Sequence, residues 1–323
     1  MLKKLTLPGT DLQVSQLCYG TNMLGTAIDQ PTTDAILDRF VELGGNFLDT
    51  ARSYGDWVPD APAGASERAI GQWLKGRNRA EVVIATKGAQ VDMRAGDYRN
   101  RVTPEDIAQD LAESLDHLGI DTIDLYWLHA DNPQAPVGPL VDALLEHRAA
   151  GKVRYFGASN WTPARIAEAN AYAESLGQQG FVASQTFWGL AVPDREESDK
   201  QGYQLHYESG YQDIHAAGVT MIPYAAQSGG YFTKLAEGGE EGLPGFLKAR
   251  YGNPANARRF AAVQAMAAKH GVSLNEVVLA YLVNQPHLTI PIFGARRPEQ
   301  VEESVKAASL VLTADELAQL RGE

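Results

Sequence analysis

The chain has 323 residues, of which 44% are hydrophobic and 21% are charged, a composition typical of a globular protein with a large core. Its 28 Lys and Arg against 40 Asp and Glu leave a net charge of −12 without a basic cluster. A nucleic-acid partner is therefore disfavoured, because phosphate backbones attract clustered positive charge. The single cysteine, Cys18, excludes an intramolecular disulfide and is typical of a reducing compartment.

The first residues, MLKKLTLPGTDLQVSQL, lack the apolar core that follows the lysines of a signal peptide. No stretch reaches the roughly 18 apolar residues of a transmembrane helix, so we expect a cytoplasmic protein with no membrane partner. Two short alternating runs flank the turn residues 8–11. This pattern predicts an N-terminal β-hairpin.

Beyond the hairpin, a short apolar run followed by an amphipathic helix recurs along the chain. The predicted strand and helix pairs are 17–19 with 32–43, 46–49 with 65–75, 82–86 with 103–118, 123–128 with 137–150, 153–157 with 162–176, 181–185 with 199–217, 219–223 with 255–270 and 273–284, and 289–292 with 297–308. Runs such as VVIAT and IDLYWL are almost continuously apolar, as parallel strands covered on both faces require. Eight such units without a linker indicate a (β/α)8 TIM barrel, with residues 1–323 as a single domain. An open doubly wound sheet is the alternative.

Helix ends carry independent signals. Thr103 before Pro104 predicts an N-cap, and Gly119 is placed to end the same helix in a left-handed conformation. Ser273 with Glu276 forms a capping box before an apolar run. These signals support the helix predictions beyond apolar periodicity.

Long loops are expected at the C-terminal face of the barrel. Residues 225–256 contain seven glycines and two prolines, which predicts either a mobile flap over a ligand or a solvated insertion. A second long loop, 186–198, carries Phe187 and Trp188.

Several common site motifs are absent. No two glycines are spaced GxG and no GxxxxGK occurs, so a nucleotide is not held by a Rossmann fingerprint or a P-loop. The seven histidines contain no HxH or HExxH, and with one cysteine no metal site is expected. The GxSxG motif of a hydrolase elbow is also missing.

Ionisable residues follow three neighbouring predicted strands at the rim where barrel enzymes place their chemistry. They are Asp49 and Tyr54 after the second strand, Lys87 after the third and His129 after the fourth. Each alone has an ordinary structural interpretation: a turn cap, packing, a rim charge or a core histidine. Their shared register favours a site.

These residue types suit carbonyl chemistry. A buried aspartate keeps a lysine charged, and the ammonium is expected to lower the pKa of Tyr54 from about 10. Such a tyrosine is a general acid, and a neutral His129 orients the carbonyl oxygen beside it. The predicted reaction is carbonyl reduction or its reverse. A non-redox lyase that forms a Schiff base on Lys87 is an alternative.

The chain resembles the aldo-keto reductase family along essentially its whole length. The resemblance is carried by the segments FLDTARSYG with ASERAIGQWL, VVIATKG, DTIDLYWLHAD, GKVRYFGASNW and IPIFGARRPEQVEES. It implies that Asp49, Tyr54, Lys87 and His129 are the catalytic tetrad, with Tyr54 as proton donor. It also implies NADPH/NADP+ as cofactor, bound in an extended form without a Rossmann domain.

The resemblance further assigns cofactor-binding positions. The resemblance implies that Ser159, Asn160 and Gln185 bind the nicotinamide carboxamide and that Tyr224 stacks on the nicotinamide ring. The 2′-phosphate and adenine fall to Gly294, Arg296, Gln300, Glu303 and Ser304. Ser304 stands where the family often has Asn, and Ala225, Ala226 and Gln227 replace the usual small-proline-leucine run.

The substrate is expected to be a small carbonyl compound. The candidate pocket residues are Arg52, Trp57, Trp161 and Trp188. Indole rings suit an aromatic or long aliphatic aldehyde or the C–H face of a sugar, and Arg52 tilts the prediction towards a sugar unless it pairs with a neighbouring carboxylate. Alternatives are a cofactor-sensing binding subunit and an NAD-linked sugar or alcohol dehydrogenase running oxidatively. A monomer is expected, since no heptad repeat is evident.

Overall fold

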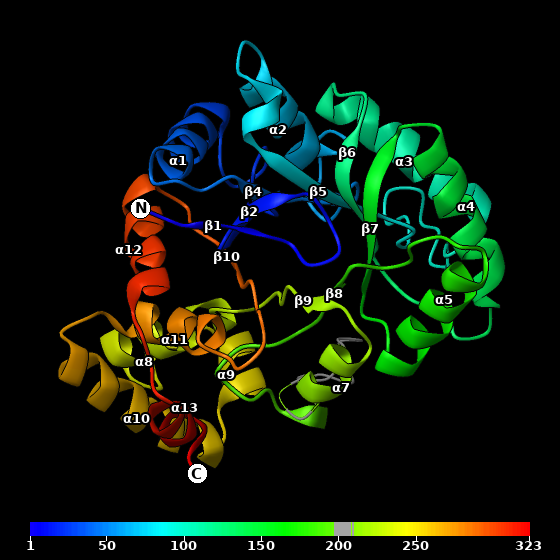
Figure 1. Ribbon diagram of the computed structural model, residues 1–323. Coiled ribbons are helices and arrows are strands. Elements are labelled where there is room, and N and C mark those ends of the chain that lie inside the picture. The colour runs from blue at the N-terminus through cyan, green and yellow to red at the C-terminus, as the bar shows by residue number, and fades with distance from the viewer. Residues whose placement is uncertain (197–207, 209) are drawn as a thin grey trace.

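A computed structural model describes residues 1–196, 208 and 210–323 (Figure 1). The predicted N-terminal hairpin is present: strand β1 (Lys4–Thr6) pairs antiparallel with β2 (Gln13–Ser15). The backbone N–H of Ser15 donates to Asn46 Oδ1 at 2.8 Å, next to the start of a barrel strand. The hairpin therefore covers the N-terminal end of the barrel.

Eight parallel strands form one sheet in the described part of the chain, with the order β10-β3-β4-β5-β6-β7-β8-β9. Their bounds are β3 Cys18–Gly20, β4 Phe47–Asp49, β5 Val83–Gly88, β6 Ile123–Leu128, β7 Val153–Ser159, β8 Ala183–Gln185, β9 Thr220–Met221 and β10 Ile292–Phe293. A parallel bridge between Met221 and Thr289 joins the last strand region to the first, and Ile292 N donates to Pro223 O at 2.9 Å. The sheet thus closes into a (β/α)8 barrel, and the open doubly wound alternative is wrong.

Helices surround the strands (Figure 1). Their bounds are α1 Gln30–Glu42, α2 Ala65–Leu74, α3 Pro104–Leu118, α4 Val137–Ala149, α5 Pro163–Ser175, α7 Tyr211–Ala216, α8 Tyr231–Gly238, α9 Gly245–Tyr251, α10 Pro254–His270, α11 Leu274–Val283, α12 Pro298–Lys306 and α13 Ala314–Arg321, with short 3-10 turns η1 Arg79–Glu81, η2 Ser228–Gly230 and η3 Ala307–Ser309. The cap predictions are confirmed: Thr103 accepts from Asp106 N, and Gly119 ends α3 at φ 64°. Ser273 and Glu276 form the capping box of α11.

The core has two layers that follow the alternation of strand side chains. Inside the barrel, Phe47, Val83 and Trp127 pack with Leu7 and Val14 of the hairpin region. A larger cluster fills the space between the strands and the helices. Side chains at inward positions of the last strand residues therefore face the barrel mouth.

One prediction about a long segment needs correction, and two others fall partly outside the described residues. Residues 225–256 are not a loop, because they contain η2, α8 and α9. Phe232 and Leu247 from these helices are each 1% exposed, so apolar burial orders a segment whose glycines indicated flexibility. Of the predicted helix 199–217, the structure describes α7 only, and residues 199–207 and 209 lie outside the described residues, as do 197–198 of the loop 186–198.

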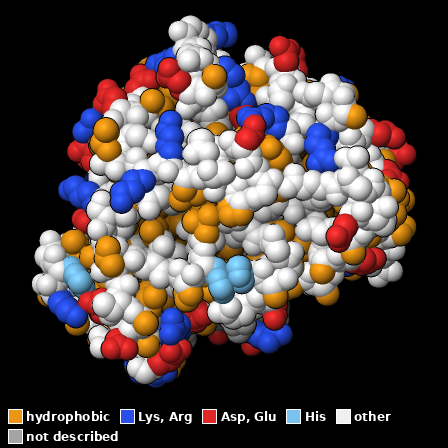
Figure 2. All heavy atoms as spheres, viewed as in Figure 1, with side chains coloured by type: hydrophobic (Ala, Val, Ile, Leu, Met, Phe, Trp, Pro, Cys, Tyr) orange, Lys and Arg blue, Asp and Glu red, His pale blue; other side chains and the backbone are white. Residues whose placement is uncertain are grey.

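The surface carries charges of both signs. Figure 2 shows basic and acidic side chains interspersed on the face drawn, with apolar side chains gathered towards its middle. Within the described residues, no helix is long and apolar enough to span a membrane.

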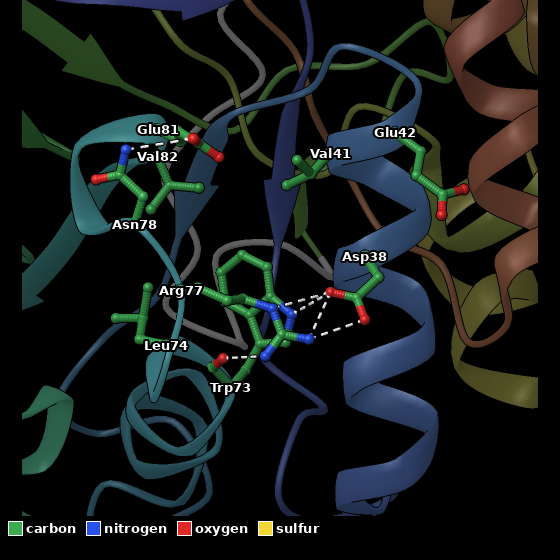
Figure 3. Close-up of a pocket in the computed structure, with 9 residues that line it drawn as sticks. All are labelled: Asp38, Val41, Glu42, Trp73, Leu74, Arg77, Asn78, Glu81 and Val82. Atoms are coloured by element: carbon green, nitrogen blue, oxygen red, sulfur yellow. Dashed lines mark hydrogen bonds and ion pairs between the residues drawn. The ribbon is translucent and has the colours of Figure 1, made fainter.

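A surface groove of about 380 Å³ lies between α1 and α2. Arg77 faces Asp38 at 2.7 Å and stacks over the Trp73 ring at 5.0 Å (Figure 3). The Trp73 indole N–H also donates to Asp38. These polar groups thus satisfy one another, and the groove shares no residue with the strand-end cluster.

Candidate active site

Strand alternation brings two of the predicted ionisable residues to the barrel interior. Asp49 is two residues after the inward Phe47 on β4, and Lys87 is two residues after the inward Ala85 on β5. Their side chains are 3% and 0% exposed. Both charges are therefore withdrawn from water, which is costly unless each finds a partner.

The Lys87 ammonium finds three partners. Its Nζ lies 2.5 Å from Asp49 Oδ2, 2.7 Å from the Thr50 carbonyl oxygen and 3.0 Å from the Tyr54 hydroxyl oxygen. An ammonium group has three N–H donors, so all of them are used. In the hydrogen bonds of the described residues, the Tyr54 phenol accepts from Lys87 and donates to no protein group. Its own proton is available to a ligand.

The predicted fall in the pKa of Tyr54 is wrong for the free protein. Burial raises the pKa of Tyr54 and the Asp49 charge adds to the rise, while Lys87 opposes it and does not cancel it. Burial also works against the charged form of Lys87, but Asp49 and Tyr54 outweigh it and hold the pKa of Lys87 above its ordinary value. The site thus keeps a neutral phenol beside a charged ammonium.

His129 lies beside the tyrosine. Its ring meets the Tyr54 ring edge-on at 6.1 Å between centroids, and its backbone N–H donates to Gly88 O at 2.9 Å. Burial and the charge of Lys87 lower the pKa of His129 to about 3. The imidazole is therefore neutral near pH 7, as expected from the sequence. Its Nδ1 is buried with no hydrogen-bond partner in the described part of the chain.

The positions assigned to the nicotinamide carboxamide adjoin this cluster. Gln185 Nε2 donates to Asp49 Oδ1 at 2.9 Å, and Tyr224 donates its hydroxyl proton to Asn160 Oδ1 at 2.8 Å. Asn160 is a non-glycine residue with a left-handed φ of 61°, and its Nδ2 bonds His129 O and Ser159 Oγ, both at 3.2 Å. These residues form one polar wall running from β6 to the end of β9.

The positions assigned to the 2′-phosphate and adenine form a second group. Arg296 is exposed, its backbone N–H donates to Gln300 Oε1 at 2.8 Å, and no carboxylate of the described residues pairs with it. Glu303 is half-buried and Ser304 is fully buried on α12. The exposed Gly294 donates its N–H to Gln227 Oε1 at 2.8 Å.

The two groups are joined by a turn suited to an anion. Ser228, Gly229 and Gly230 have consecutive positive φ values of 51°, 65° and 76°, and the Ser228 hydroxyl is buried without a partner among the described residues. The pKa of Lys234, on the helix that follows, is lowered by burial and by the nearby charge of Arg296. The Lys234 ammonium donates to Gly229 O at 2.5 Å, and the N–H groups of Ser228 and Gly230 donate to Ala225 O and Gln227 O. The positive charges of Lys234 and Arg296 beside this turn fit the phosphates of a dinucleotide.

Arg52 does not lie free at the mouth. Its side chain is 9% exposed and pairs with Glu113 at 2.8 Å and with Asp92 at 2.9 Å. The neighbouring Asp110, which also accepts from Arg101, lies 3.5 Å away. The structure therefore favours the carboxylate-paired interpretation of Arg52 over a substrate contact.

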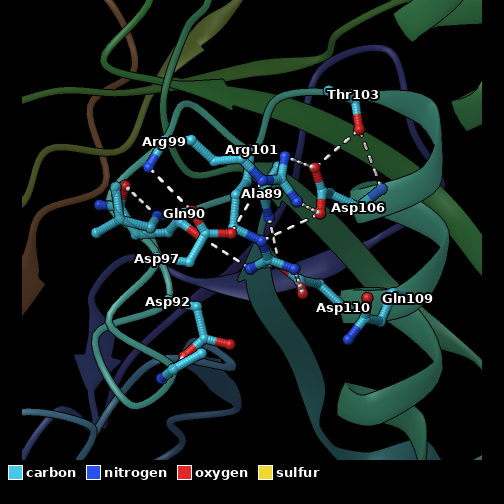
Figure 4. Close-up of polar contacts among 12 residues, drawn as sticks. Ala89, Gln90, Asp92, Asp97, Arg99, Arg101, Thr103, Asp106, Gln109 and Asp110 are labelled. Atoms are coloured by element: carbon cyan, nitrogen blue, oxygen red, sulfur yellow. Dashed lines mark hydrogen bonds and ion pairs between the residues drawn. The ribbon is translucent and has the colours of Figure 1, made fainter.

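This ion-pair cluster holds down the segment that follows β5. Arg101 lies between Asp106 and Asp110 (Figure 4), with N–O distances of 3.1 and 2.7 Å. Asp110 also accepts from the backbone N–H of Ala89 at 2.8 Å, two residues after Lys87. The cluster thus connects α3 with the strand end that carries the ammonium.

The three candidate tryptophans separate. Trp161 and Trp188 are 0% and 1% exposed and pack inside the protein, so their assignment as substrate residues is not supported by their positions. Trp57 is 49% exposed and meets the Tyr54 ring at 6.0 Å. It is the one of the three that offers a face to a ligand.

Sequence reasoning missed three participants in these contacts. Thr50 acts through its backbone carbonyl, which no residue pattern reveals. Gln227 was noted only as a departure from a motif, and Asn275, which accepts from Gln227 Nε2 at 2.9 Å, gave no signal within the first turn of α11.

Comparisons with known proteins agree with this geometry. A sequence model of the Aldo/keto reductase family matches residues 16–322. The chain therefore belongs to the aldo-keto reductase family, an oxidoreductase family that uses nicotinamide cofactors.

Three relatives illustrate the range of similarity. Norsolorinic acid reductase B of Dothistroma septosporum is 27% identical over 97% of this chain and 79% of its own length. Aldo-keto reductase ausK of Aspergillus calidoustus is 29% identical over 98% and 80% of the two chains. Aryl-alcohol dehydrogenase GME11368 of Pestalotiopsis microspora is 26% identical over 98% and 80%.

Proposed function

We propose that the protein is an NADPH-dependent reductase that converts an aldehyde or ketone to an alcohol. The observation that carries this proposal is the contact of one buried ammonium, Lys87, with both Asp49 and Tyr54. A neutral phenol hydrogen-bonded to a permanent cation is a proton donor whose conjugate base is already stabilised.

When bound along these residues, NADPH would supply the hydride that the carbonyl carbon takes up. Tyr54 gives its phenolic proton to the carbonyl oxygen, which stays bonded to carbon as the hydroxyl group of the alcohol, and Tyr54 becomes a phenolate. Lys87 stabilises that phenolate, and Asp49 keeps Lys87 charged. Neutral His129 donates a hydrogen bond to the same carbonyl oxygen and orients it.

The cofactor preference rests on charge. Ser159, Asn160, Gln185 and Tyr224 supply amides, a hydroxyl group and an aromatic ring for the nicotinamide end. Arg296, with Gln300, Glu303 and Ser304, supplies the other end. An exposed guanidinium that pairs with no carboxylate of the described residues suits a 2′-phosphate, which NADPH has and NADH lacks.

For the substrate, the position of Arg52 removes the reason to favour a sugar. Trp57 remains at the mouth beside Tyr54, and its exposed indole suits a planar aromatic aldehyde or ketone. The name of one relative, an aryl-alcohol dehydrogenase, points to the same class.

The test compares Tyr54→Phe with a matched control, Tyr155→Phe. Tyr155 donates to Asp11 beside the hairpin turn, at the other end of the barrel. Tyr54→Phe is expected to lower turnover of benzaldehyde with NADPH by about 100-fold or more and to leave NADPH binding within about twofold of wild type, while Tyr155→Phe keeps both. Undiminished turnover in Tyr54→Phe would contradict the acid role. Binding without turnover of any carbonyl by the wild type would favour a cofactor-sensing subunit.

A further inference from the structure

One side chain connects the segment after β9 with the segment after β10. Gln227 accepts a hydrogen bond from Gly294 N at 2.8 Å through Oε1 and donates through Nε2 to Asn275 Oδ1 at 2.9 Å. Asn275 Nδ2 in turn donates to Ser304 Oγ at 3.1 Å. These three bonds form a relay across residues that are 67, 48 and 29 positions apart in the chain.

The relay runs between two walls of the proposed cofactor cleft. Gln227 directly precedes the 228–230 turn and lies three residues after Tyr224. At the other side, Gly294 follows β10, and the fully buried Ser304 lies on α12 beyond Arg296. The 228–230 turn and the adenine positions are thus connected by side-chain hydrogen bonds rather than by the backbone of a shared element.

The bond to Gly294 has a direct consequence. The backbone N–H of Gly294 is already occupied by Gln227, and the space over its Cα is open, since an added Cβ would meet nothing nearer than Gln227 Oε1 at 4.0 Å. The structure therefore gives Gly294 the role of an anchor for Gln227, and the departure from the usual leucine at position 227 has a use.

We infer that Gln227 and Asn275 are positioning residues for the cofactor. Their relay fixes the spacing between the 228–230 turn and the adenine positions of α12 before the dinucleotide binds. This inference rests on the proposed function. A preformed cleft binds more tightly, because the loss of conformational entropy on ordering its walls is not subtracted from the binding free energy. Both amides act through Gly294, Ser304 and the turn.

The three hydrogen bonds form one chain, so variants at its two amides should have overlapping effects. Gln227→Met keeps the length of the side chain and removes the first two bonds, and Asn275→Leu removes the last two. Both variants break the central link between the amides. Their effects on cofactor binding should therefore overlap rather than add, because coupled residues in one network are non-additive.

The experiment measures NADPH dissociation constants and release rates by fluorescence for the wild type, both single variants and the double variant. Gln285→Met is the matched control, because its amide donates to the backbone of Tyr281 at the far end of α11. We expect Gln227→Met to raise the dissociation constant about tenfold, mostly through faster release, with the double variant no weaker than the weaker single one. Gln285→Met should bind like the wild type even where its thermal midpoint falls.

The outcomes separate the inference from the proposed function. Two results would overturn the relay and leave the reductase assignment intact. One is a dissociation constant of Gln227→Met within about twofold of the wild-type value. The other is a double variant in which the effects of the two single substitutions add fully. Absence of saturable NADPH binding by the wild type would overturn both.

Discussion

Tyr54 accepts a 3.0 Å hydrogen bond from Lys87, and burial nevertheless holds the pKa of the phenol above its ordinary value. Two effects oppose each other here: the ammonium favours the phenolate, while removal from water disfavours it. Because burial prevails, the phenol keeps its proton until a substrate oxygen accumulates negative charge.

Removing the ammonium should damage both turnover and stability. Lys87→Met takes the stabilising charge from Tyr54 and leaves buried Asp49 unpaired, so we expect about 100-fold lower turnover and a loss of about 3–5 kcal/mol in the free energy of unfolding. Turnover assays and urea unfolding measure the two effects. Asp49→Asn combined with Lys87→Met should recover part of the stability and none of the turnover. A single variant as stable as wild type would argue against the buried pair.

Turnover in the direction of reduction should not fall at mildly acidic pH through protonation of His129. The imidazole is neutral well below pH 6.5 because burial and Lys87 lower its pKa to about 3, and burial raises the pKa of Tyr54 above its ordinary value. Turnover at saturating aldehyde is therefore expected to be level between pH 6 and 9. A fall centred near pH 6.5 that disappears in His129→Gln would show that the imidazole is charged during reaction.

Stability should depend on Arg52 far more than on a surface arginine. Arg52→Met leaves the carboxylates of Asp92, Asp110 and Glu113 without this partner, so we expect a loss of about 3 kcal/mol or more. Arg39, which is 36% exposed, also pairs with two glutamates. Arg39→Met should change stability by at most about 1 kcal/mol. Equal effects on the thermal midpoint would contradict the importance of the buried cluster.

The choice between the two cofactors should follow Arg296. Arg296→Ala is expected to weaken NADPH binding about tenfold and to leave NADH binding unchanged, because only the 2′-phosphate is lost as a partner. Arg297 is the control, since its guanidinium lies 3.7 Å from Glu299. Fluorescence titration with both nucleotides makes the comparison. A parallel loss for NADPH and NADH would place Arg296 elsewhere than at the 2′-phosphate.

The regular elements were predictable because their signals are local. Thr103 and Gly119 mark the ends of α3 through their own side chain and backbone, and the predicted range 103–118 differs from the observed Pro104–Leu118 by one residue. The 225–256 segment failed for the opposite reason. Its glycines indicate flexibility locally, while Phe232 is buried and stacks on Phe260 of α10, a more distant helix.

The site was predictable to the same degree. Asp49, Lys87 and His129 end adjacent parallel strands, so alternation and strand order alone bring them to one rim. The pKa values of these residues could not be predicted from the sequence, because desolvation depends on what covers each group. Trp161 and Trp188 illustrate the limit again: an indole after a strand has the same sequence signature whether it lines a mouth or packs under a helix.

The repeated strand and helix units, the helix caps and the residue types at the strand ends can be read from the sequence, since these features depend on neighbours within a few positions. Three other features follow only from the folded arrangement: the carboxylates around Arg52, the burial that raises the pKa of Tyr54, and the bond between Gln227 and Gly294. Each of these depends on groups brought together from distant parts of the chain, where burial and charge act through space rather than along the backbone.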